Sequence, residues 1–202
     1  GLTETSPVLT FEPLGKSRAG TIGVPVPNTI VACLDDAGNP VPQGETGEIA
    51  AKGPQVMEGY WQKPEETAKV MKNGYFLTGD IGVMDADGYF RIVDRKKDMV
   101  VVSGFNVYPN EIEDMLVTHP GVLEAAVIGV PDEASGEAVK AYIVKSDSGL
   151  TEQDVRSFCK EHLTNYKVPK RVECRDELPK SNVGKILRKD LRAEELAKIA
   201  AE

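Results

Sequence analysis

The chain has 202 residues, 41% hydrophobic and 28% charged, which is typical of a globular protein with one large domain or two small ones. Its net charge of −8 argues against general nucleic-acid binding, and no apolar run approaches the roughly 18 residues that span a bilayer. The three cysteines are too scattered for a disulfide framework or a metal site, and reduced thiols fit the cytosol.

The first 95 residues show short strand patterns separated by turns. Residues 1–20 are expected to be the end of something larger, and we interpret the chain, which starts at Gly1 and not at Met, as a fragment. Residues 21–95 predict a small β-rich lobe, with hairpin turns at the Asp- and Gly-containing segments 35–39 and 85–88. Residues 64–72 predict a short helix, with an early proline, acids in the first turn and Asn-Gly as the stop.

Residues 89–104 change character twice. Tyr89–Val93 alternates like a strand with one buried face, and Met99–Gly104 is a second, largely apolar strand. Between them, the run Asp94–Asp98 is purely charged and is expected to be too short and too polar to pack inside the protein. A charged connector between apolar strands predicts a boundary between two lobes, and the alternative is an ordinary hairpin with a solvated turn.

Residues 96–202 alternate strand and helix and predict a compact C-terminal domain. The predicted order is a helix over 109–119, strands over 122–130 and 138–145, a helix that follows a capping box at 151–154 and ends near Leu163, short strands near Arg171 and Ile186, and a helix from Asp190. The predicted fold class is α+β, with the small β-rich lobe joined to this domain by a charged hinge at residues 94–98.

Four sequence motifs occur in one order along the chain. They are Gly1–Thr5, Leu77–Asp80, the segment Val93–Glu113 and Pro179–Lys185. Together they resemble the motifs of adenylate-forming enzymes, the acyl-CoA synthetase family, and within it the bacterial long-chain fatty acid–CoA ligases most. The resemblance covers nearly the whole chain and implies the C-terminal portion of such an enzyme, with its fold, in which residues 1–20 are the end of a mostly absent N-terminal domain.

The first motif offers groups that suit a nucleotide. A hydroxyl such as that of Thr3 can donate to a phosphate oxygen, and a carboxylate such as that of Glu4 is a hard ligand for Mg²⁺. The resemblance implies that Thr3 contacts the adenylate phosphate, that Glu4 binds the metal on ATP, and that the backbone at Gly1 approaches the nucleotide. The alternative is a frayed terminus with no ligand.

The second motif and the hinge motif add three charged candidates. Asp80 can accept both hydrogens of a ribose diol, and Arg95 carries fixed donors for ribose or phosphate oxygens. The resemblance implies these roles, and it implies that Lys97 is the hinge residue and also contacts the nucleotide. By composition alone, Asp80 is more typical of a structural turn, and Arg95 and Lys97 are more typical of charges in a solvated connector.

The remaining candidates follow the hinge. Lys185 is a compact charge on a flexible stem, and the resemblance implies that it stabilises the negative charge that develops as the adenylate forms. Without its motif, a loop lysine is usually only solvated. The resemblance also implies that Val102, Ser103 and Gly104 line the passage for coenzyme A. Val101 is apolar where some relatives carry lysine, so no contact is expected from that side chain.

The implied activity is ATP-dependent ligation of a fatty acid to coenzyme A, with AMP and pyrophosphate as products and acyl-adenylate as the intermediate. Its partners are then small molecules, namely fatty acid, ATP with Mg²⁺, and coenzyme A. One alternative is an enzyme that delivers its acyl-adenylate to a carrier protein or to oxygen; another is an inert module that binds nucleotide or coenzyme A. The fragment alone is expected to be inactive, because it retains no phosphate-cradling glycine loop.

The implied substrate also bears on location. An enzyme of long-chain acids is expected in the cytoplasm, with peripheral contact to the inner face of the membrane. No feature of the sequence indicates an oligomeric state.

Overall fold

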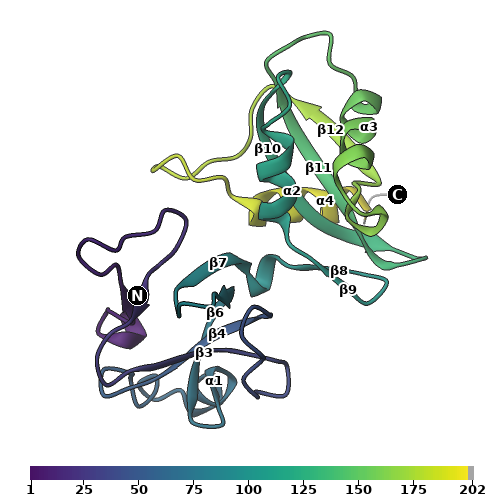
Figure 1. Cartoon of the computed structure of the whole chain (residues 1–202). Helices are drawn as coiled ribbons and strands as arrows, with labels where there is room; N and C mark the ends of the chain where they lie inside the picture. Colours follow the sequence, from purple (N-terminus) through teal and green to yellow (C-terminus); the bar gives the residue numbers. More distant parts are fainter. Residues whose placement is uncertain (200–202) are drawn as a thin grey trace. The chain divides into compact units, whose positions relative to one another are not determined.

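A computed structural model describes residues 1–199 of the protein, which divides into two compact units, Gly1–Lys97 and Asp98–Glu202 (Figure 1). The boundary between the units falls inside the charged run 94–98. Both units contain strands and helices, and the predicted α+β fold class is confirmed.

The first unit is built on an antiparallel five-stranded sheet. Four strands follow the order β3-β4-β6-β5, and β7 pairs with the other end of β6. A separate two-stranded ribbon joins β1 to β2. The strands are β1 (Thr10–Phe11), β2 (Val24–Pro25), β3 (Ile30–Leu34), β4 (Thr46–Lys52), β5 (Met71–Lys72), β6 (Tyr75–Met84) and β7 (Phe90–Arg95). Residues from β3, β4 and β7 form its core, with Phe90 fully buried.

Turn chemistry organises this sheet. The predicted turns at 35–39 and 85–88 are present, each with a glycine at positive φ. The predicted helix is α1 (Pro64–Val70), which ends earlier than expected because Met71 and Lys72 become a strand. Asn73 and Gly74 both have positive φ and form the two-residue turn of the β5–β6 hairpin, so they do more than stop a helix.

The charged run corrects one prediction. It was expected to be too polar to pack inside the protein, yet Asp94 and Asp98 are only 1% and 8% exposed. Strand β7 continues through Arg95, and the 3-10 turn η2 (Lys96–Asp98) follows. Buried carboxylates are tolerated when they are hydrogen-bonded or paired, which is the case for both.

The second unit has its own five-stranded sheet, in which four strands follow the order β10-β11-β8-β9. Strand β12 pairs in parallel with residues 140–144 of β11, beyond the point where β8 pairs with β11. Three longer helices accompany it (Figure 1). The elements are β8 (Val100–Val102), β9 (Phe105–Val107), α2 (Pro109–Leu116), β10 (Val122–Asp132), β11 (Gly136–Lys145), α3 (Glu152–His162), β12 (Arg171–Arg175) and α4 (Arg188–Ile199).

Strand β9 was missed from the sequence. The apolar run that predicts one strand over 99–104 is a hairpin, because Ser103 and Gly104 both adopt positive φ and turn the chain back on itself. Near Ile186, where a strand was expected, there is a single bridge to Lys180.

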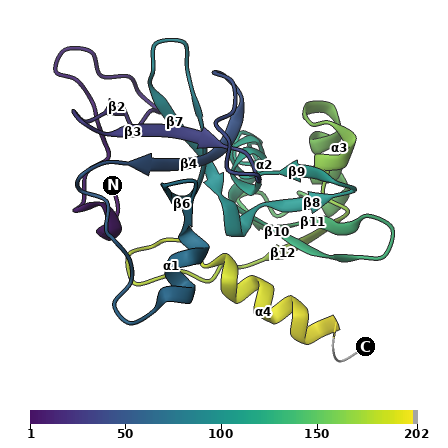
Figure 2. The same ribbon diagram turned by 90° about the horizontal axis from the view of Figure 1, so that it is seen from below.

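The sheet of the second unit is covered on both faces. Alternate residues of β10 point into two clusters: Ala125 and Val127 join the cluster that includes α2 and α3, whereas Ala126 and Ile128 join the cluster that includes Leu191 of α4. In Figure 2, α4 lies apart from α3, as expected for helices that contribute to different clusters. Because both faces are covered, β11 is buried along most of its length.

The helix predictions hold with small shifts of their ends. Helix α2 buries Ile112 and Leu116 as predicted, and Met115 packs against the same cluster. The capping box predicted before α3 is present, with the backbone N–H of Asp154 donating to Thr151 Oγ1 at 3.2 Å and the N–H of Thr151 donating to Asp154 Oδ2 at 3.0 Å. Within residues 1–199, no helix is long and apolar enough to cross a membrane.

Candidate functional site

A bulge in strand β6 presents the second motif. The β4–β6 ladder shifts register just after Glu48, so residues 78–80 lie opposite Ile49 alone. Thr78 Oγ1 donates to the carbonyl of Ile49 at 2.6 Å, and Gly79, at φ +76°, donates its N–H to Glu48 Oε1 at 3.1 Å. A bulge changes the direction in which side chains leave the strand, and here the Thr-Gly-Asp segment departs from the regular ladder of β6.

Strand pairing brings two predicted nucleotide residues together. Asp80 of β6 lies directly opposite Arg95 of β7, and Arg95 Nε is 2.7 Å from Asp80 Oδ1. The side chain of Asp80 is only 14% exposed, whereas that of Arg95 is 54% exposed. The carboxylate is therefore fixed by the sheet, and the guanidinium retains donors that a ligand could meet.

The first motif is a 3-10 turn, η1 (Thr3–Thr5), held by the buried side chain of Thr5. The Thr5 hydroxyl lies 3.0 Å from the carbonyl of Leu2 and 2.9 Å from that of Pro7. Gly1 packs closely here, since a Cβ at this position would lie 1.6 Å from the Pro7 oxygen. Thr3 is exposed. Thr5, which was not among the candidates, shapes the turn that carries them.

Glu4 is oriented by an aromatic residue that the sequence did not single out. Tyr60 donates its phenol to Glu4 Oε1 at 3.0 Å, and the N–H of Met57 donates to the Glu4 carbonyl at 2.8 Å. Removal from solvent raises the pKa of Tyr60, and the bond to Glu4 raises it further, so the phenol stays protonated as a donor. An aromatic pair, Tyr60-Trp61, in a polar loop was the available signal.

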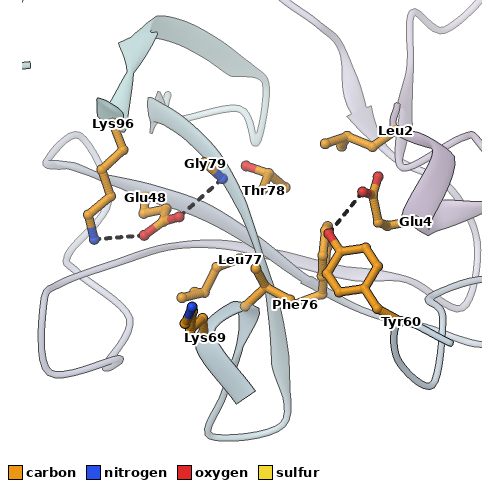
Figure 3. A pocket seen from close by; sticks show the side chains of 11 residues that line it. Leu2, Glu4, Glu48, Tyr60, Lys69, Phe76, Leu77, Thr78, Gly79 and Lys96 are labelled. Carbon is orange, nitrogen blue, oxygen red and sulfur yellow. Dashed lines mark hydrogen bonds and ion pairs between the residues drawn. The ribbon is translucent and has the colours of Figure 1, made fainter. Parts of the chain in front are cut away.

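These groups surround a cavity of about 330 Å³ within the first unit (Figure 3). Its lining includes Glu4 and Tyr60 on one side and Glu48 with Lys96 on another, and Thr78 and Gly79 of the bulge also border it. Asp80 and Arg95 do not line it, although each is next in the chain to a lining residue, Gly79 and Lys96 respectively. The volume is at the small end of the range of about 300–1,000 Å³ that is usual for ligand pockets.

Glu48 links the bulge to the end of β7. It is buried, and its second oxygen, Oε2, lies 2.8 Å from Lys96 Nζ, which is also 3.3 Å from Asp36 Oδ1. The hydrogen bond to Glu48 is the main cause that raises the pKa of Lys96. Glu48 was missed, and its signal was a lone carboxylate inside the otherwise uncharged stretch 47–51.

The predicted hinge residue is exposed. Lys97 has no side-chain hydrogen bond or ion pair within the part of the chain that the structure describes, whereas Asp98 lies 2.7 Å from the guanidinium of Arg192 and 3.4 Å from that of Arg188. The pivoting role of Lys97 stays a prediction.

Lys185 belongs to a tight loop of the second unit. The N–H of Ser181 donates to the Lys185 carbonyl at 2.8 Å, and the N–H of Lys185 returns a bond to Ser181 Oγ at 3.1 Å. Gly184, at φ +78°, allows the turn between them. The Lys185 side chain is exposed, and its amine has no partner among residues 1–199.

The predicted coenzyme A segment is a hairpin tip. Ser103 and Gly104 are exposed, and the N–H of Ser103 donates to the carbonyl of Ser135 at 2.9 Å. The side chain of Val102 is buried in the core, so only its backbone could meet a ligand. Val101 is partly exposed and its N–H donates to Glu137 Oε2 at 2.7 Å.

The residues present fit a magnesium ion only in one way. Among the described residues there is no group of three or more His, Cys, Asp or Glu side chains that could hold a metal ion. Glu4 instead offers a single carboxylate at the cavity, with one oxygen oriented by Tyr60. Mg²⁺ commonly binds through one or two carboxylates together with the phosphates of its nucleotide, so a site of that kind fits.

Comparisons with known proteins agree with the motifs. Residues 1–61 match the family "AMP-binding enzyme", and residues 111–185 match the "AMP-binding enzyme C-terminal domain". The chain is 58% identical, over 98% of its length, to a long-chain-fatty-acid–CoA ligase of Escherichia coli O6:H1, and 48% identical, over 96%, to one of Bacillus subtilis. It spans only 36% and 35% of the length of these curated relatives.

Solved structures show the same fold. ATP-bound MatB from Rhodopseudomonas palustris matches 96% of this chain with a TM-score of 0.88 and 39% identity, and the match covers 39% of MatB. The amide bond synthetase McbA from Marinactinospora thermotolerans matches 87% of the chain, and 36% of its own, with a TM-score of 0.76 and 39% identity. The chain therefore belongs to the AMP-binding, or adenylate-forming, enzyme family, and its second unit contains that family's C-terminal domain.

Proposed function

We propose that this chain is the C-terminal portion of a long-chain fatty acid–CoA ligase. The observation that carries the proposal is its 55–60% identity to several bacterial long-chain-fatty-acid–CoA ligases across nearly all of its residues. The overall reaction consumes a fatty acid, ATP and coenzyme A, and it yields acyl-CoA, AMP and pyrophosphate. Two half-reactions share one acyl-adenylate intermediate.

In the first half-reaction, the fatty acid carboxylate attacks the α-phosphate of ATP and pyrophosphate leaves. Asp80 accepts the ribose hydroxyls and Arg95 donates to the nucleotide, a division of work that the exposed guanidinium and the sheet-fixed carboxylate support. The backbone at Gly1 and the hydroxyl of Thr3 approach the phosphates. Glu4 would hold Mg²⁺, which neutralises phosphate charge when it is bound.

Lys185 completes this half-reaction. Negative charge increases around the α-phosphate and the attacking carboxylate, and a cation placed there stabilises the transition state. The loop of Lys185 is held by backbone hydrogen bonds and by the Ser181 hydroxyl, and the exposed amine, which has no partner among residues 1–199, is free to serve as that cation.

In the second half-reaction, the thiolate of coenzyme A attacks the acyl carbonyl and AMP leaves. The second unit turns about Lys97, which withdraws Lys185 and presents the hairpin tip at Ser103 and Gly104 together with the backbone of Val102. Lys97 also contacts the nucleotide in one of the two orientations. The long-chain substrate places the enzyme in the cytoplasm, with peripheral contact at the inner face of the membrane.

The test is a pair of assays on the longer parent protein that contains this chain. With oleate and ATP, we expect pyrophosphate release; with coenzyme A added, we expect oleoyl-CoA at a matching rate. The 202-residue chain alone serves as the inactive control. Turnover of oleate that is unchanged by coenzyme A would overturn the ligase proposal in favour of another acyl acceptor.

Other relatives define the competing outcomes. A feruloyl-CoA synthase of Amycolatopsis is 45% identical over 95% of this chain, so ferulate is the matched competing acid. Coenzyme A-dependent turnover of ferulate but not oleate would keep the reaction class and reject the long-chain substrate. Transfer of the acyl group to an amine, as the name of the amide bond synthetase McbA describes for that protein, or to a carrier protein would reject coenzyme A as the acceptor. Binding of ATP without turnover would reduce the parent to an inert binding protein.

A further inference from the structure

The residues on either side of Lys97 are each tied to their own unit by a charged contact, and Lys97 itself is not. We propose that these contacts confine the rotation between the units to Lys97, and that Glu48, Arg188 and Arg192 are positioning residues of the hinge. The proposal deepens the proposed function, because it rests on a second unit that alternates between two half-reactions.

The contact on the first unit joins Lys96 to Glu48. Lys96 Nζ lies 2.8 Å from Glu48 Oε2, and the Glu48 side chain is 7% exposed, so the pair is partly shielded from water. The other oxygen of Glu48 accepts the N–H of Gly79, which fixes the carboxylate against the bulge of β6. One residue earlier, Arg95 is held by Asp80 at 2.7 Å. The chain is thus fastened to the first sheet through Lys96.

The contact on the second unit joins Asp98 to helix α4. Arg192 reaches Asp98 Oδ1 at 2.7 Å and Arg188 reaches Asp98 Oδ2 at 3.4 Å, and these two arginines are one helical turn apart. Arg188 is itself fixed by Glu113 of α2 at 2.5 Å. The side chain of Asp98 is 12% exposed, and the two arginines pair with this largely buried carboxylate. The chain is therefore fastened to the second unit from Asp98 onward.

Lys97 lies between the two contacts. It is exposed, and within residues 1–199 its side chain has neither a hydrogen bond nor an ion pair. Each residue contributes two soft backbone dihedrals, so a connector fastened on both sides of one residue retains two, whereas release of both neighbours leaves about six. A rotation through two dihedrals reaches few orientations, which favours a switch between defined states over diffuse motion.

The same contact bears on the catalytic loop. Arg188 begins α4 three residues after Lys185, so the residue that fastens the hinge also begins the helix that follows the lysine loop. A rotation about Lys97 then carries that loop as part of a rigid unit.

The first experiment measures the spread of inter-unit distances on the 202-residue chain itself. Spin labels are attached at Thr46→Cys in β4 and Glu161→Cys in α3, both exposed, on a Cys174→Ser background; Cys33 and Cys159 are buried. Double electron–electron resonance then gives the distance distribution. We expect Lys96→Met with Asp98→Asn to broaden it roughly twofold, because the number of free dihedrals triples.

Matched controls remove equivalent charged pairs elsewhere in each unit. Arg18→Met breaks the pairs with Asp85 and Asp87 in the first unit, and Glu111→Gln breaks the pair with Lys167 in the second. Neither should change the distribution, and Lys96→Arg should retain the wild-type width. An unchanged width in the double variant, with a wild-type circular dichroism spectrum, would overturn the proposal, as would equal broadening in the controls.

The second experiment uses the longer parent. Asp98→Asn is expected to lower the rate of both half-reactions by roughly five- to thirty-fold, the cost of reordering about one further backbone residue in each productive orientation. The KM for ATP should not change, because Asp98 does not line the cavity. A raised KM with unchanged rates would assign Asp98 to nucleotide binding and overturn the hinge role. If the wild-type parent makes no acyl-CoA, the proposed function is wrong. The distance distributions of the 202-residue chain still test whether the rotation is confined to Lys97.

Discussion

The two units hold their charged motif residues in opposite ways. In the first unit, Asp80 is part of a strand, its side chain is 14% exposed, and Arg95 lies directly opposite at 2.7 Å. In the second unit, Lys185 lies in an exposed loop that is fixed through its backbone, and its amine meets no partner among residues 1–199. The difference indicates that the proposed nucleotide-binding groups are preorganised, whereas the proposed action of Lys185 depends on where its unit is placed.

In the second unit, buried charged residues also hold α4, the helix that follows Lys185 in the chain. Lys140 Nζ lies 2.7 Å from Glu195 of α4 and 2.8 Å from Glu173 of β12, and Tyr142 donates to Glu195 at 3.1 Å. All but Glu173 are less than 10% exposed. Burial, and then the neighbouring Glu195 charge, raises the pKa of Tyr142, which keeps the phenol a donor. The network holds α4 against the sheet, so the loop before α4 has a fixed base.

The largest effect should follow from breaking this network. Lys140→Met leaves Glu195 buried without its main partner, and we expect the second unit to lose about 3–5 kcal/mol of unfolding free energy. Denaturant-dependent hydrogen exchange, followed peptide by peptide, measures each unit. The first unit should keep its stability, and Lys140→Met with Glu195→Leu should restore much of the loss. Equal losses in both units would mean that they unfold as one, and the comparison would fail.

Removal of the lysine amine should separate the half-reactions. In the longer parent, Lys185→Ala is expected to slow adenylation by about 10²–10³, or roughly 3–4 kcal/mol, and to spare the thioester-forming step. The lost cation is exposed, so stability should not change. Pyrophosphate release, and acyl-CoA formation from supplied acyl-adenylate, measure the two steps. Lys189→Ala, an exposed lysine nearby in α4, is the control; equal losses in both steps would refute alternation.

Neutralisation of the preorganised carboxylate tests the other side of the comparison. Asp80→Asn is expected to weaken ATP binding by about ten- to hundredfold, since a hydrogen bond to a charged group contributes roughly 1.5–3 kcal/mol. Calorimetric titration of the longer parent with ATP gives the affinity. Asp87→Asn, an exposed carboxylate of the same unit, should bind normally. Undiminished affinity in Asp80→Asn would remove this residue from the nucleotide site.

The smallest expected effect is on the stability of the second unit at acidic pH, through Glu173. Burial by itself would raise the pKa of Glu173, but hydrogen bonds from Lys140, Lys198 and Arg175 outweigh it and hold the pKa at about 2 instead of 4.5. A depressed pKa stabilises the folded state above pH 4.5, and that contribution is lost as the pH falls toward 2. We expect Glu173→Gln to flatten this part of the second unit's stability profile, measured by denaturation between pH 5 and 2. A profile as steep as that of the wild type would assign the acid sensitivity to other groups.

The sequence by itself determined the elements whose signals are local. The alternating run Tyr89–Val93 predicted β7, the capping box predicted the start of α3, and Asp- and Gly-containing segments predicted two turns of the first sheet, because period and turn chemistry depend on neighbouring residues. The four motifs likewise predicted the family, since their residue types and order are read directly along the chain.

Only the tertiary structure decided how the site residues are held. Thr78–Asp80 bulge because β6 pairs with β4, some thirty residues away in sequence, and Glu48 matters because that pairing places it beside Gly79 and Lys96. Asp98 is buried because α4, ninety residues further along, supplies its arginines. Long-range pairing decides which charges are paired and desolvated, and no local pattern encodes a partner that is distant in the chain.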